Sequence, residues 1–96
     1  MENTYYLIVE QHAGGRCLRT LDEYADASRL VADAADYEAG EFPGRWVGAL
    51  ELSFDDSGAL VAALPLTDVA AGVQAELKSR SEWRQRQVAL DRWTAR

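Results

Sequence analysis

The sequence has few of the residues that build special sites: one cysteine, one histidine, one lysine and two prolines in 96 residues. A single cysteine, Cys17, excludes an intramolecular disulfide scaffold. One cysteine and one histidine also cannot supply the ligands of a cysteine-rich or histidine-rich zinc site. The longest apolar run, residues 59–66, is far shorter than the ~20 residues that span a bilayer. The first residues do not have the basic start and apolar core of a signal peptide, so we expect a cytoplasmic protein.

Motifs that bind phosphates or metals are also missing from the sequence. There is no Gly-x-x-x-x-Gly-Lys loop, no Gly-x-Gly-x-x-Gly fingerprint and no EF-hand loop. Cys17 and His12 are close enough in sequence to form a nucleophile–base dyad across a hairpin. The competing interpretation is a buried strand thiol beside a surface histidine, and we favour it. We therefore expect no catalytic residue, no metal site, no cofactor and no enzymatic activity.

What the sequence does have is an apolar content of 48%, which is too high for a disordered chain, and a length that suits one domain. Its net charge of −6 is unevenly distributed. Residues 1–77 carry fourteen acidic and four basic side chains, a net charge of −10. Residues 78–96 carry six basic and two acidic side chains, a net charge of +4. We expect a single acidic domain over residues 1–96 with a basic, tryptophan-containing helical segment from about residue 79. The acidic part of such a domain repels nucleic acid and attracts basic surfaces.

Turn and capping signals divide the chain into elements. The expected strands cover residues 4–10, 16–19, 46–54 and 59–64, with turns at 12–15 and 55–58. Thr20 and Glu23 form a capping box that predicts a helix running to about Glu38. Thr67 is the expected N-cap of a last helix, in which Ser79 and Glu82 form a second capping box. The last segment is therefore predicted either as two helices or as one long helix.

This order, β(β)αββα(α), predicts an α+β fold with two layers, in which helices cover one face of an antiparallel sheet of three or four strands. The strand over residues 46–54 alternates clearly. Trp46, Leu50, Leu52 and Phe54 point one way in this pattern, and we expect Leu50 and Leu52 to be buried.

Four aspartates, Asp22, Asp26, Asp33 and Asp36, fall along one stripe of the first predicted helix, with Arg29 in the middle. One interpretation is a solvated face on which Arg29 reduces the repulsion between the carboxylates. The other is a row of carboxylates that imitates the phosphates of nucleic acid and binds a basic protein surface. The sequence leaves both open.

The last segment has a second notable face. Trp83, Arg86, Leu90 and Trp93 follow one another at spacings of three, four and three, which places them on one side of a helix. If this helix packs on the sheet, the tryptophans complete the core. If it projects, two tryptophans next to arginines are typical of a protein-binding surface. Arginines with aromatics also bind nucleic acid, but the acidic remainder of the chain argues against direct binding here.

In size, charge and element order the chain resembles small acidic proteins of phages and mobile elements, among them anti-CRISPR and antirestriction inhibitors. The resemblance rests on no motif and carries over no site residue. It implies a non-enzymatic inhibitor in the bacterial cytoplasm that blocks a basic nucleic-acid-binding surface, such as that of a CRISPR effector. The alternative is a self-associating structural module, antitoxin or phage accessory protein that uses Trp83, Arg86 and Trp93, as a homodimer for example. Neither hypothesis involves nucleic acid or a membrane as a direct partner.

Overall fold

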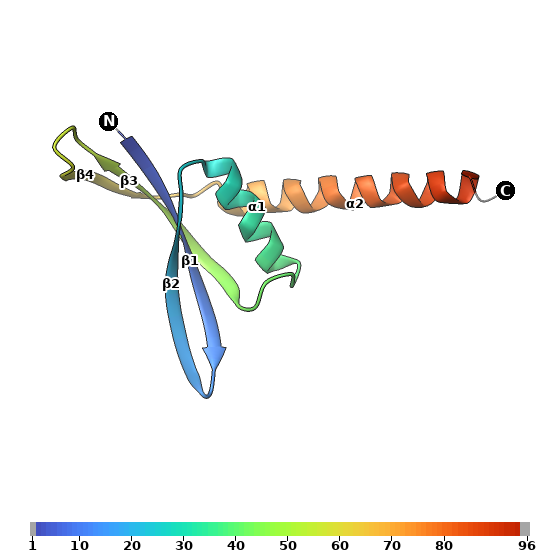
Figure 1. Cartoon of the computed structure of the whole chain (residues 1–96), viewed down its shortest axis with the longest axis horizontal. Helices are drawn as coiled ribbons and strands as arrows, with labels where there is room; N and C mark the ends of the chain where they lie inside the picture. The colour runs from blue at the N-terminus through green and yellow to red at the C-terminus, as the bar shows by residue number, and fades with distance from the viewer. Residues whose placement is uncertain (1, 95–96) are drawn as a thin grey trace.

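The computed structural model of the chain describes residues 2–94 and contains one sheet and two helices (Figure 1). The elements in chain order are β1 (Glu2–Ala13), β2 (Arg16–Tyr24), α1 (Ala27–Glu38), β3 (Arg45–Phe54), β4 (Leu60–Pro65) and α2 (Val69–Thr94). All neighbouring strands are antiparallel, in the order β2-β1-β3-β4, and the helices lie on one side of the sheet. The predicted α+β fold and element order are confirmed.

Both predicted hairpins are present, and local turn chemistry explains them. β1 and β2 are joined by Gly14 and Gly15, whose φ angles of 59° and 76° are both positive. A two-residue turn of this kind matches the twist of antiparallel strands, and glycine adopts it without strain. In the second hairpin, between β3 and β4, the Asp55 carboxylate accepts hydrogen bonds from the backbone amides of Ser57 and Ala59. These turns set the register of the strand pairs that follow them.

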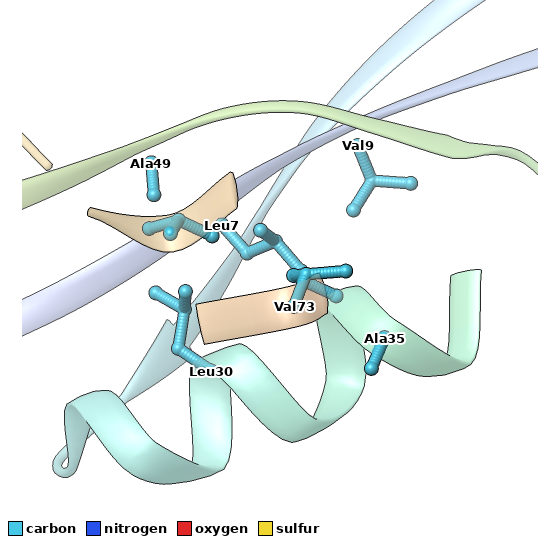
Figure 2. Packing of buried hydrophobic residues seen from close by; sticks show 8 residues of the cluster. Leu7, Val9, Leu30, Ala35, Ala49 and Val73 are labelled. Carbon is cyan, nitrogen blue, oxygen red and sulfur yellow. The ribbon is translucent and has the colours of Figure 1, made fainter. Parts of the chain in front are cut away.

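The core lies between the sheet and the two helices (Figure 2). Alternate residues of β1, Leu7 and Val9, point toward the helices because successive side chains of a strand face opposite sides. The buried apolar residues are Leu7, Val9, Leu30, Ala34, Ala35, Ala49, Val69 and Val73. Three of these eight are alanines, so the core is small for a chain of 96 residues.

The first helix begins later than the capping box predicted. Thr20 and Glu23 belong to β2, where they pair with Val9 and Tyr6 of β1. Helix α1 starts at Ala27, and Asp26 is its N-cap, accepting a hydrogen bond of 2.9 Å from the amide of Ser28. The long register between β1 and β2 extends the strand through the Thr-x-x-Glu motif, so that strand pairing replaces the helical turn that the capping box would begin.

The alternation of β3 is also interrupted. A β-bulge where Ile8 and Val9 pair with β3 shifts the register, so Trp46 lies on the helix side and packs against the core. Leu50 and Leu52 lie on the other face and are only half-buried, which contradicts the expectation that they belong to the core. A bulge adds one residue to one strand and reverses the side to which the residues beyond it point.

Helix α2 is one continuous helix of 26 residues, so Ser79 does not begin a second helix. Its first part packs on α1, where a Cβ added at Gly72 would lie 3.1 Å from Val31 Cγ1. Its second part leaves the body and runs toward the C-terminus (Figure 1). As a result, the radius of gyration is 17.5 Å, whereas a compact domain of this length has about 12.5 Å.

The small core makes a specific prediction for stability. We expect Leu7→Ala to lower the free energy of unfolding by about 2–5 kcal/mol, because it leaves a cavity under α1 and α2. Leu64→Ala is the matched control, since Leu64 is 57% exposed and should change stability by no more than about 0.5 kcal/mol. Urea unfolding followed by circular dichroism measures both. Equal losses in the two variants would contradict this description of the core.

Candidate functional site

The four aspartates of the predicted stripe do not form an exposed row on one helix. Asp22 lies in β2 and Asp26 is the N-cap of α1, so only Asp33 and Asp36 are within the helix. Three of them are bound to side chains from other elements. Tyr37 donates to Asp22 at 3.4 Å, Tyr24 to Asp33 at 2.5 Å, and Arg80 to Asp36 at 2.7 Å. Partner binding by these aspartates stays a prediction, but the prediction that all four lie along one stripe of a helix is wrong.

Arg80 fixes α2 to α1. Its guanidinium donates to Asp36 of α1, to Glu76 one turn earlier at 3.0 Å, and to the Ala32 carbonyl at 3.3 Å. The hydrogen bonds from Arg80 to Asp36 and Glu76 raise the pKa of the guanidinium further, so it stays charged. Because the side chain is only 28% exposed, this bridge is less screened by water than an ordinary surface pair.

Beyond Arg80 the helix contacts little of the body. Every residue from 81 to 93 is exposed, and we call this segment the arm. Trp83 is 61% exposed and Trp93 is 75% exposed. Val88 and Leu90 are 50% and 56% exposed. Tryptophan is normally well buried in a folded domain, so two such residues on one projecting helix form an unusual surface. The structure thus selects the projecting alternative for this segment.

The tryptophan side of the arm continues a side of α2 that packs on α1. At 100° per residue, Trp83, Arg86, Leu90 and Trp93 lie on average roughly 120° around the helix from Val73, but Leu90 lies five full turns beyond Gly72, which approaches Val31 of α1. The first part of this side is covered by α1, whereas Trp83, Arg86, Leu90 and Trp93 are exposed. We call these four residues the tryptophan face.

A second polar cluster lies at the far end of the β1–β2 hairpin, on the sheet face away from the helices. The side chain of Glu10 is only 7% exposed, and it is the buried acidic group at the centre of this cluster. Arg45 Nη2 and His12 Nε2 lie 3.2 Å and 3.1 Å from Glu10 Oε1, and Arg19 Nε lies 3.3 Å from Oε2. Cys17 pairs with His12 across the two strands and is a further hydrogen-bond partner of Glu10.

Electrostatics in this cluster stabilise an ionised glutamate, not a reactive thiol. Burial alone would raise the pKa of Glu10, but hydrogen bonds from Cys17, Arg45 and His12 outweigh it and lower the pKa from 4.5 to about 2. Cys17 is exposed, so the expectation of a buried thiol is wrong, but partial desolvation and the neighbouring Glu10 still raise the pKa of its thiol. A catalytic thiol needs the opposite shift. The cluster therefore holds β1, β2 and β3 together and does not activate a nucleophile.

Metal binding by this cluster would require rearrangement. The ligand atoms of Glu10, His12 and Cys17 lie within 4.8 Å of one another, a distance that one ion could bridge. The carboxylate of Glu10, however, already accepts from two guanidinium groups, and these would repel a cation placed between them. We therefore interpret the cluster as structural.

Two important residues of the structure, Glu10 and Arg80, were missed as sites by sequence reasoning. Glu10 ends an apolar strand and lies next to His12, but nothing local reveals that Arg19 and Arg45 converge on it from two other strands. Arg80 pairs with Asp36 of α1, which is 44 positions away in the sequence. The local sequence signal for the ion pairing of Arg80 was its spacing of four residues from Glu76, which is typical of an ion pair on a helix.

The pocket between the helices has no cluster of polar side chains. It has a volume of about 190 Å³ and is lined by Ala27, Leu30, Val31, Leu66, Asp68 and Val69. Five of these six side chains are apolar, so the pocket offers one carboxylate and no base or nucleophile to pair with it.

No family model matches the sequence, and the searches for similar curated proteins and similar solved structures found no match. Neither helix is apolar enough over a sufficient length to cross a membrane, as far as residues 2–94 are concerned.

The shifted pKa of Glu10 predicts how the cluster responds to acid. A carboxyl whose pKa is lower in the folded state stabilises the fold above its unfolded pKa and loses this effect as it becomes protonated. We expect Glu10→Gln to be less stable than the wild type above pH 4.5, and the difference to shrink between pH 4.5 and about 2. Urea unfolding across this range measures it, with Glu82→Gln in the arm as control. A difference that is constant with pH would contradict the assignment.

Proposed function

We propose that this chain is a non-enzymatic protein-binding module, in which the folded body displays the arm to a protein partner. The observation that carries this proposal is the exposure of Trp83 and Trp93, 61% and 75%, on a helical segment in which every residue from 81 to 93 is exposed. Tryptophan and arginine are the residues most enriched among those that dominate binding energy at protein interfaces.

The spacing of the tryptophan face supports the same function. Its members recur at three, four and three residues, the pattern by which an amphipathic helix inserts one side into an apolar groove or onto an apolar surface. Between Val73 and Thr94 the sequence has neither glycine nor proline, so the arm is a stiff helix that loses little backbone entropy on binding. Glu82 and Arg86 are spaced for a helical ion pair that supports the isolated helix.

The expectation of an anti-CRISPR-like inhibitor that blocks a basic nucleic-acid-binding surface stays a prediction. It depended on carboxylates that project together into solvent, and Asp22, Asp33 and Asp36 instead bind Tyr37, Tyr24 and Arg80. The tryptophans of the arm, by contrast, are exposed and available to a partner without breaking any of these contacts. The observations therefore favour the alternative hypothesis, a module that associates through its C-terminal face.

Substitution of both tryptophans tests this function. We expect Trp83→Ala/Trp93→Ala to fold like the wild type, because neither side chain belongs to the core, and to capture at least tenfold less partner protein from a bacterial lysate. Val88→Ala is the matched control, since Val88 is 50% exposed on the other side of the arm. Quantitative mass spectrometry of the captured proteins, additional copies of this chain included, provides the measurement. Unchanged capture by the double variant would refute the proposal.

A further inference from the structure

We infer that the arm of one copy docks on the uncovered face of the sheet of a second copy, in a reciprocal pair. This inference rests on the proposed function, because it identifies the partner of the arm. Four observations carry it: an apolar sheet face opposite the helices, an arm that cannot reach that face in its own molecule, opposite net charges of arm and body, and the amount of exposed surface.

Apart from the Glu10 cluster at the end of the β1–β2 hairpin, the face of the sheet away from the helices is largely apolar. Strand register places the even-numbered residues of β1 on this side, together with their partners on β2 and β3. We call it the open sheet face, and its apolar residues include Tyr6, Ile8, Leu21, Leu50, Leu52 and Leu60. Leu21 and Leu60, on the two edge strands, are 59% and 56% exposed. In a two-layer fold, an apolar sheet face is usually covered by another layer.

The arm of the same molecule cannot provide this cover. Helix α2 begins on the helix side of the sheet and runs away from it (Figure 1). Its 26 residues extend about 39 Å without a break, since a helix rises 1.5 Å per residue. Folding the arm back over the opposite face would require the helix to break between residues 73 and 94, where there is neither glycine nor proline.

Charge selects a second copy of the body as the surface that receives the arm. The arm, residues 81–93, has three arginines and two acidic residues, a net charge of +1, whereas residues 1–77 have −10, so the arm of one copy is attracted to the body of another. Two arms side by side would instead bring like net charges together. Glu23 at one edge of the open sheet face, and the acidic turn at Asp55 and Asp56, place negative charge beside the apolar residues.

The dimensions and the areas agree with this arrangement. The thirteen residues of the arm span about 20 Å, and a sheet of four strands is roughly 15–20 Å wide. The accessible surface of the chain is 7074 Å², whereas a compact monomer of this mass exposes about 5,500 Å². The excess of about 1,600 Å² per chain exceeds the ~800 Å² that each partner buries in an interface of standard size.

Two double variants separate the two surfaces. Trp83→Ala/Trp93→Ala removes the tryptophan face and leaves the sheet intact. Leu21→Asp/Leu60→Asp charges the open sheet face at its edge strands, where both residues are exposed, and leaves the arm intact. Val88→Asp on the other side of the arm and Leu64→Asp on the helix side of β4 are the matched controls. Circular dichroism verifies that each variant folds, and sedimentation velocity gives its mass.

We expect the wild type and both controls to be dimers at about 50 µM, and each double variant alone to be a monomer. An equimolar mixture of the two double variants should form a heterodimer, because one arm and one open sheet face remain intact between them. Its dissociation constant should be weaker than that of the wild type by 10²-fold or more, since one of two linked contacts is missing. Raising the salt concentration should weaken both complexes.

Each other result has a definite meaning. If the double variant of the open sheet face forms a dimer alone, arms pair with arms. If the double variant of the tryptophan face forms a dimer alone, sheets pair with sheets. Either result overturns the inference. A monomeric wild type at 100 µM also overturns it. If the wild type is monomeric while capture of another protein still depends on Trp83 and Trp93, only this inference fails and the proposed function stands.

Discussion

The direction of the arm, and with it both exposed surfaces, depends on a short contact between α1 and α2. Val73 lies in the core, Gly72 allows α2 to approach Val31 closely, and Arg80 bridges to Asp36. These contacts involve only about the first three turns of a helix of 26 residues. Because the rest of the helix has no glycine or proline, any rotation at this contact is transmitted to the whole arm.

The sequence was most informative where structure is determined locally. The Gly14-Gly15 turn and the Asp55–Gly58 turn predicted both hairpins, because a turn of two to four residues fixes the strands on either side. The capping box at Thr20 was misleading, since the strand pairing with β1 continues through both of its residues. The side on which Trp46 lies depends on a bulge, which is a property of two paired strands and has no signal in either strand alone.

The candidate site was only partly predictable for the same reason. The spacing of Trp83, Leu90 and Trp93 predicted a shared face, and a continuous helix is compatible with it. Whether that face is buried depends on where α2 leaves α1, which the sequence does not encode within any short window. The aspartates were misjudged because their partners, such as Tyr24 and Arg80, are distant in sequence or belong to a neighbouring element.

Stability and association are coupled in such a molecule. Among residues 2–94, the large side chains that are fully buried are Leu7, Val9, Leu30 and Val73, while the tryptophan face and the open sheet face remain in contact with water. The free energy of unfolding of a single copy is therefore limited by its small core. A partner that covers the exposed apolar surfaces binds the folded state and not the unfolded chain, so it stabilises the fold by mass action. The net charge of −10 on residues 1–77 acts on any such partner, because an acidic body attracts basic surfaces and repels acidic ones.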